Sequence, residues 1–80
     1  MSRIYLKGEV ERAMTTSWQA FAEEHPRLAA VLDRQVLIEE ATQALRSDGE
    51  FNRTLQRAQA AGMVAECVRD FVEQWLRRLL

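Results

Sequence analysis

The chain has 80 residues, which is the length of a single domain. Its composition is 48% hydrophobic and 29% charged, with three glycines and one proline, which excludes a disordered, collagen-like or linker-rich chain. The 11 basic and 12 acidic residues leave a net charge of −1, so no global field draws the chain onto nucleic acid or an anionic membrane.

A chain this short forms a small core, which leaves little net stability unless something else contributes. Cys67 is the single cysteine and His25 the single histidine, so neither an internal disulfide nor a metal site built on these residue types can contribute. We therefore expect self-association as a homodimer. The lone cysteine fits a reducing cytoplasm. We expect no signal peptide, because residues 1–10 hold three charged side chains and no apolar run, and no membrane span, because no apolar run is long enough.

The first eight residues leave their conformation open. Residues 3–7 alternate polar and apolar side chains with a period of two, as a half-buried strand does, and such a strand would have to pair with a second copy. The same residues also suit a disordered start or the first turn of a longer helix. We therefore expect one helical domain over 1–80, with an extended or disordered segment over 1–8 as one possibility.

The first predicted helix covers about 9–24. Its apolar residues step by four, four and three, which places them on one stripe: Val10, Met14, Trp18 and Phe21. Pro26 disfavours helical geometry at His25, so the helix is expected to end there.

The second predicted helix covers about 26–46 and begins on Pro26. It has apolar residues on two faces. One broad face holds Val31, Leu37, Ile38, Ala41, Ala44 and Leu45. Leu32 and Val36 lie on the other, which indicates a helix that packs on two sides, either at the centre of the fold or at a dimer interface.

The third predicted helix covers about 48–61. Ser47 followed by Glu50 three residues later fits a capping box, and Gly62 fits a left-handed residue after the last turn. The apolar stripe is Phe51, Leu55 and Ala58.

The fourth predicted helix covers about 63–80 and has the clearest stripe: Val64, Val68, Phe71, Val72, Trp75, Leu76 and Leu79. The four helices together predict an all-α fold, a compact bundle. The apolar surface exceeds what a monomeric bundle of this size easily hides, so it either marks an interaction site or belongs to a well-filled core. The candidate interface residues are Leu32, Val36, Trp75, Leu76 and Leu79.

Few residues suggest catalysis. His25 lies at a helix junction with no nucleophile or orienting group converging on it, and Cys67 is interpreted as a buried structural thiol. The pair Glu39 and Glu40 has no histidine at the spacing of bundle metal sites and is interpreted as a solvated face. The sequence therefore predicts no enzyme activity, no cofactor and no metal.

Residues 54–71 resemble the helix-turn-helix family, with Ala58 at the small position and Gly62 at the turn. The resemblance implies a recognition helix in the major groove. That helix departs from the family because its presented residues are net acidic, whereas DNA contacts need basic and amide side chains. These residues are Ala65, Glu66, Arg69, Asp70 and Glu73.

The N-terminal half resembles the ribbon-helix-helix repressors, in which paired strands of a dimer enter the major groove. Arg3, Tyr5 and Lys7 would share the DNA-facing side of such a ribbon. The turn Glu24–Arg27 departs from the glycine and small polar residue typical of that family.

The leading interpretation is a small cytoplasmic, non-enzymatic helical protein that acts through protein–protein contacts and self-association. We expect no membrane binding, because an anionic surface would repel the acidic residues that share a helix with the Trp75–Leu80 end. The alternative is a dimeric DNA-binding regulator that uses Arg3, Tyr5 and Lys7.

Overall fold

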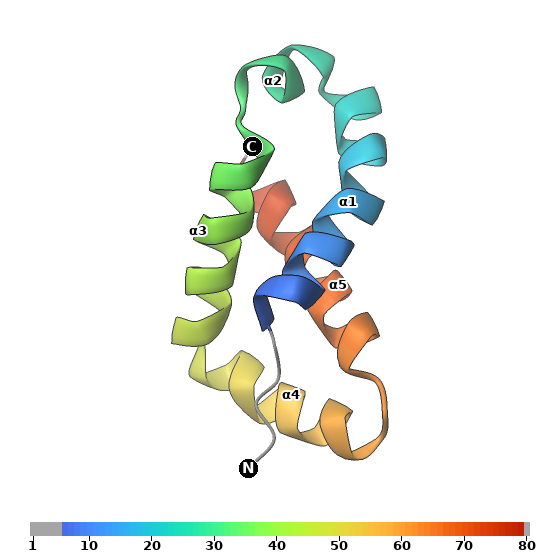
Figure 1. Ribbon diagram of the computed structural model, residues 1–80, viewed down its shortest axis with the longest axis vertical. Helices are drawn as coiled ribbons and strands as arrows, with labels where there is room; N and C mark the ends of the chain where they lie inside the picture. The colour runs from blue at the N-terminus through green and yellow to red at the C-terminus, as the bar shows by residue number, and fades with distance from the viewer. Residues whose placement is uncertain (1–5, 80) are drawn as a thin grey trace.

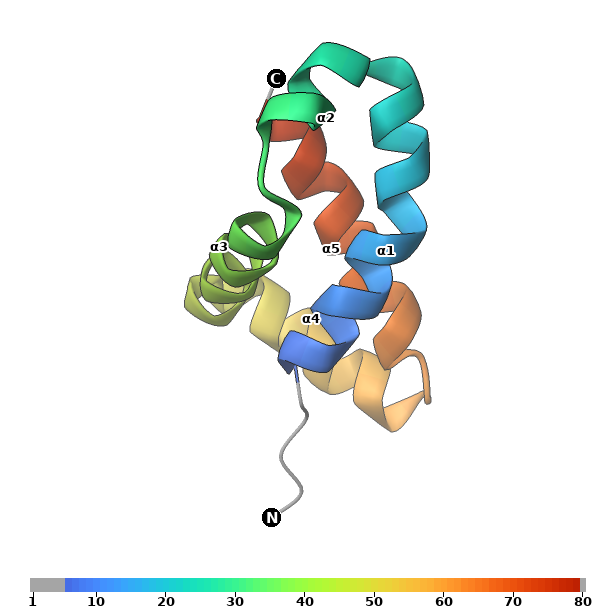
Figure 2. The same cartoon turned by 45° about the horizontal axis from the view of Figure 1, so that its top comes forward.

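A computed structural model describes residues 6–79, and over this range the all-helical class is confirmed. Five helices are found there rather than four. They are α1 (Leu6–Glu24), α2 (Pro26–Val31), α3 (Arg34–Ser47), α4 (Gly49–Ala60) and α5 (Val64–Arg78). In Figures 1 and 2, α1, α3 and α5 run along the long axis, α2 closes one end, and α4 crosses the other.

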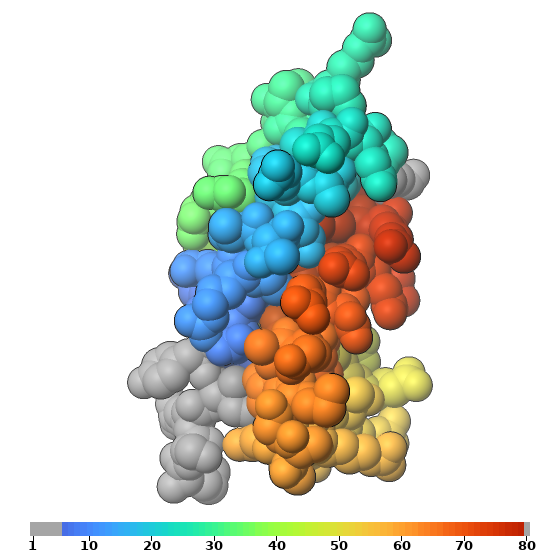
Figure 3. Space-filling view, turned by 90° about the vertical axis from the view of Figure 1, so that its right-hand side faces the viewer, coloured from blue at the N-terminus to red at the C-terminus, as the bar shows by residue number. Residues whose placement is uncertain are grey.

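The core lies where α1, α3 and α5 meet. Most of its members were predicted on the apolar stripes, whereas Phe71 and Trp75 of the predicted last stripe are only partly buried and Leu79 is exposed. The largest fully enclosed side chains are Val10, Met14, Leu45, Val68 and Val72. The most extensive contact between two helices is that of α1 with α5, and Figure 3 shows these two helices side by side over one face. The predicted stripe of the first helix is confirmed, with Trp18 packed at the edge of the core.

The predicted helix over 26–46 is wrong at one point, because it breaks at Leu32 and Asp33. Leu32 has extended backbone angles (φ −85°, ψ 138°), and Asp33 is the N-cap of α3. The Asp33 side chain accepts a hydrogen bond from the Gln35 backbone amide at 2.9 Å. An aspartate that satisfies a free amide in this way favours a new helix start over continued helix.

This break explains the two apolar faces predicted for the second helix. The residues on either side of the break belong to different helices, so a single helical wheel does not describe them. Leu32 packs against the core, whereas Val31 is 80% exposed and Val36 is 47% exposed.

The link between α3 and α4 is a single residue, Asp48, which is also the N-cap of α4. Its side chain accepts from the Phe51 backbone amide at 2.9 Å, and its carbonyl oxygen accepts from the Asn52 side chain at 2.8 Å. The predicted cap at Ser47 is therefore wrong by one position, because Ser47 is the last residue of α3.

Two predicted helix ends are confirmed. Helix α1 ends at Glu24, just before His25 and Pro26. The chain turns after α4 at Gly62, whose φ of 71° is the left-handed conformation that glycine adopts without steric cost. The Met63 amide then donates to the Ala58 carbonyl oxygen at 2.7 Å, which closes the turn into α5.

The described start of the chain is helical, which differs from the strand alternative predicted for residues 3–7. Lys7 and Gly8 are helical because α1 begins at Leu6, which packs against the core. The first turn of a longer helix is thus the alternative that these residues follow, and an extended segment through residue 8 is wrong for 6–8. Arg3 and Tyr5 lie outside the described residues.

Leu76 and Leu79 give a matched test of this packing. Leu76 is 3% exposed and Leu79 is 40% exposed at the end of the same helix. We expect Leu76→Ala to lower the free energy of unfolding by about 3 kcal/mol, because a buried leucine leaves a cavity, and Leu79→Ala by less than about 1 kcal/mol. Urea denaturation of both variants at one protein concentration measures the difference, and equal losses would contradict the placement of Leu76.

The cap of α4 gives a second matched test. Asp48→Ala removes the acceptor for the Phe51 amide and is expected to cost about 1 kcal/mol of unfolding free energy. Ser47→Ala removes no side-chain cap and is expected to leave that free energy within about 0.5 kcal/mol of the parent. The same urea titrations decide between the two residues, since a capping role for Ser47 predicts the opposite order.

Candidate functional site

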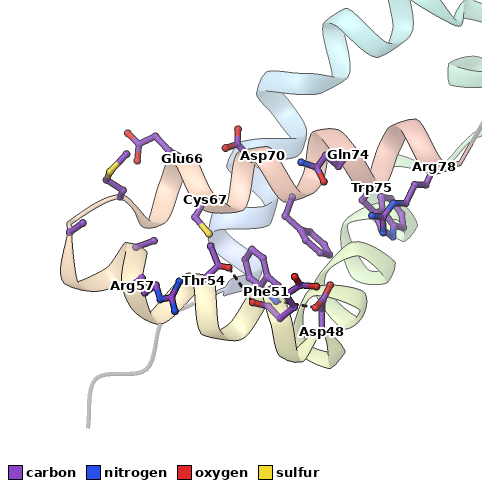
Figure 4. A pocket seen from close by; sticks show the side chains of 15 residues that line it. Asp48, Phe51, Thr54, Arg57, Glu66, Cys67, Asp70, Gln74, Trp75 and Arg78 are labelled. Atoms are coloured by element: carbon purple, nitrogen blue, oxygen red, sulfur yellow. Dashed lines mark hydrogen bonds between the residues drawn. The ribbon is translucent and has the colours of Figure 1, made fainter.

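A groove lies between α4 and α5. These helices run antiparallel as a hairpin closed by the Gly62 turn (Figure 4). The groove has a volume of about 690 Å³, within the usual range for binding pockets. Its lining residues are Asp48, Glu50, Phe51, Thr54, Arg57, Ala58, Ala61, Met63, Glu66, Cys67, Asp70, Phe71, Gln74, Trp75 and Arg78.

The floor of the groove is apolar because α5 carries two neighbouring apolar stripes. Val68, Val72 and Leu76 are buried in the core. Residues one position earlier form a second stripe at a spacing of four, Cys67, Phe71 and Trp75, and these are half-buried in the groove. The floor is therefore the flank of the same helix whose other side completes the core.

Helix α4 supplies the opposite wall. Phe51 lies against Phe71 with 4.8 Å between the ring centroids, and the two planes are tilted by 57°. Such a tilted pair is a favourable aromatic geometry. Further along α4, toward the Gly62 turn, the wall is formed by the small side chain of Ala58. Met63, at that end, is 51% exposed.

The rim of the groove is polar and exposed. On the α4 side it consists of Glu50, Thr54 and Arg57, with the half-buried Asp48 at the helix start. On the α5 side it consists of Glu66, Asp70, Gln74 and Arg78, one residue per turn. An apolar floor within a polar rim is the usual anatomy of a protein contact surface.

Cys67 contributes a thiol, a potential nucleophile, to the groove floor, and its surroundings disfavour the thiolate form. Burial raises the pKa of the Cys67 thiol, and the carboxylate of Asp70 raises it further. Reactive cysteines have the opposite setting, with positive charge nearby and a lowered pKa. The predicted buried structural thiol is half-buried in the structure, so its edge is accessible.

The other residues weighed for chemistry lie apart from the groove. His25 is the N-cap residue of α2 but makes no side-chain cap hydrogen bond, and its ring lies 5.5 Å from that of Phe21. Glu39 and Glu40 are exposed on α3, as the solvated-face interpretation expects. No group of three or more potential metal-ligating side chains occurs within residues 6–79.

The candidate interface residues do not form one surface. Trp75 lines the groove, whereas Leu76 is buried in the core. Val36 and Leu79 are exposed, and Leu32 is half-buried against the core beside the α2–α3 break. Phe51, Met63 and Phe71 also line the groove but were not among the candidate interface residues, although Phe71 belongs to the predicted apolar stripe of the last helix.

A second hollow lies between α1 and α5 and measures about 210 Å³. Its lining mixes Ser17 and Glu24 of α1 with Glu73 and Arg77 of α5. The buried Ser17 hydroxyl has no hydrogen-bond partner among the described residues. This hollow is about one-third the volume of the groove, so the groove is the stronger candidate site.

The ribbon alternative finds no added support in the described part of the chain. Lys7 is exposed but helical, so it does not continue a strand from Arg3 and Tyr5. The candidate recognition helix is α5, and the groove-side residues that it exposes include Glu66 and Asp70. Both carboxylates would repel DNA phosphates.

Comparison with known proteins gives no relative: no protein-family model, curated protein or solved structure matches the chain. Within residues 6–79 none of the helices combines the length and apolar character needed to cross a bilayer.

The raised pKa of Cys67 is testable by alkylation. At pH 8 we expect iodoacetamide to modify Cys67 more slowly than a free cysteine in an unstructured peptide, because less thiolate is present. Asp70→Asn is expected to shift the pH–rate profile toward lower pH, since it removes one of the two causes. Glu39→Gln, on α3, is the control and should leave the profile unchanged. A pH–rate profile with its midpoint at a lower pH than that of the peptide would contradict the raised pKa of Cys67.

Proposed function

We propose that this chain is a small, non-enzymatic cytoplasmic protein that acts through protein–protein contacts, and that it self-associates as a homodimer through the α4–α5 groove. The observation that carries the proposal is the groove floor, where Cys67, Phe71 and Trp75 remain half-buried beside an exposed Met63. Apolar surface gathered in one groove of a small protein generally marks a contact site.

The size of the chain supports self-association. An 80-residue domain leaves little net stability after the conformational entropy of folding is overcome. Contact with a second copy would cover the floor of the groove and so add to the buried apolar surface. Ligands and partners that bind only the folded state stabilise it by mass action.

The chemistry of the groove also favours contact over catalysis. Its thiol has a raised pKa, and the lone histidine lies at the α1–α2 junction outside the lining. Catalysis needs a nucleophile or base within reach of an orienting group. A cytoplasmic location is supported by the single, accessible thiol, which a reducing compartment would keep free.

The test places a long charged side chain in the groove. Ala58 lies in the lining and is half-buried, so Ala58→Arg is expected to fill the groove and to shift the mass in solution from twice the chain mass to the chain mass. Ala60→Arg is the matched control, because Ala60 is exposed on the same helix outside the lining. Light scattering after size-exclusion chromatography measures both, with circular dichroism to verify folding.

A third variant separates the groove from the remaining exposed candidate interface. Val36 is exposed on the first turn of α3, so Val36→Arg tests a contact there. A dimer that survives Ala58→Arg but dissociates with Val36→Arg would overturn the groove as the contact surface. A monomeric parent at high concentration would overturn self-association itself.

A further inference from the structure

The rim of the groove has a charge order that matches its own two-fold copy, and we propose from this that the α4 rim of one chain pairs with the α5 rim of a second chain. The inference rests on the proposed self-association and adds its geometry. It names the occupant of the groove as the hairpin of a second copy, with Arg57 facing the partner's Glu66 and Asp48 facing the partner's Arg78.

The first observation is the order of charges along each helix. On α4 the lining runs from Asp48 and Glu50 at the start to Arg57 near the end. On α5 it runs from Glu66 and Asp70 near the start to Arg78 at the end. Both helices therefore change from acidic to basic along their length.

The second observation is that the two helices are antiparallel. Each rim residue of α4 therefore lies at the same height along the groove, here called a level, as a rim residue of α5. Arg57 and Glu66 lie at the end of the groove near the Gly62 turn, and Asp48 and Arg78 lie at the opposite end (Figure 4). The Phe51–Phe71 contact fixes the register between them.

A two-fold axis parallel to the groove would leave each residue at its level. It would also bring the α4 rim of each chain opposite the α5 rim of the other. At the Gly62 end, Arg57 then faces a carboxylate, the partner's Glu66. At the next level the partner's Asp70 faces Thr54, an uncharged side chain whose hydroxyl donates to the Glu50 carbonyl oxygen at 3.1 Å, so this level adds no repulsion between like charges. Symmetry repeats each contact, as in any isologous interface.

The remaining two levels are also complementary. The Glu50 carboxylate faces the amide of the partner's Gln74, and Asp48 faces a guanidinium, that of the partner's Arg78. No level brings like charges together. The pairing also sets α4 antiparallel to the partner's α5, so the ends of their helix dipoles are opposed favourably.

The third observation is that these charges are not already paired within the chain. The ion pairs found among residues 6–79 are Arg12 with Glu9 and His25 with Glu24, and neither involves the rim. Asp48 uses one side-chain oxygen as a cap for α4, and the carboxylate keeps further acceptor capacity. The rim charges are therefore free to set the register of a partner.

The test reverses one charge on each rim. In Arg57→Glu homodimers two carboxylates would meet at both copies of the contact, and in Glu66→Arg homodimers two guanidinium groups would meet. We expect each variant to raise the dimer dissociation constant by about tenfold to a hundredfold at low salt. The double variant Arg57→Glu/Glu66→Arg restores opposite charges and is expected to return the constant to within about threefold of the parent.

Mixing the two single variants gives the sharpest result. One chain with Glu at 57 and one with Arg at 66 would pair attractively at both contacts, so heterodimers should form well above the half expected from random mixing. Native mass spectrometry of the full chains, with one variant isotope-labelled, counts the three dimers. Arg53→Glu and Glu39→Arg, at exposed sites outside the groove, are the matched controls and should leave the parent dimer unchanged.

The outcomes separate the two proposals. A parent chain that stays monomeric overturns the proposed self-association and the pairing together. A parent dimer insensitive to both reversals, or random mixing of the variants, overturns the pairing alone. Selective heterodimers of Glu66→Arg with Arg78→Glu instead would place α5 against the partner's α5 and also overturn it, while selective pairing of Arg57→Glu with Glu66→Arg supports it.

Discussion

The packing of α5 against α1 is the interaction on which the rest of the structure depends. It makes the longest helix–helix contact and encloses Val10, Met14, Val68 and Val72 completely. Because α5 faces α1 with one of its two apolar stripes, the other stripe must lie beside it, about one-quarter of a turn away. The contact that forms the core therefore also creates the groove floor at Cys67, Phe71 and Trp75.

Much of the fold was predictable because local signals and packing agree. Period-3.6 stripes identified the core faces of α1, α4 and α5, and Pro26 and Gly62 marked two helix ends. The break at Leu32 and Asp33 was missed because Pro26 to Arg46 contains no glycine or proline after its first residue. There the aspartate cap at Asp33, a weaker local signal, prevails over helix continuity.

The site was less predictable than the fold, for a physical reason that Leu76 illustrates. A helical wheel shows which residues share a face, but a groove arises from how two helices meet. Leu76 and Trp75 are adjacent in sequence and equally apolar in pattern, yet α1 covers the first and leaves the second at the groove. Helix α4 forms the other wall of the groove at Trp75, and the link of one residue at Asp48 joins α4 directly to α3.

The charge order of the rim follows from a constraint that acts on each helix separately. Carboxylates near a helix start and guanidinium groups near its end stabilise the helix dipole, so Glu50 and Glu66 suit first turns and Arg57 and Arg78 suit last turns. An antiparallel hairpin with that pattern on both arms carries opposite charges across its groove at each end. Exchange of the arms by a two-fold axis preserves this complementarity, because it replaces each rim by the other at the same level. Local helix stabilisation thus generates the charge order on which the proposed pairing rests, and that pairing would bury the apolar floor between the rims.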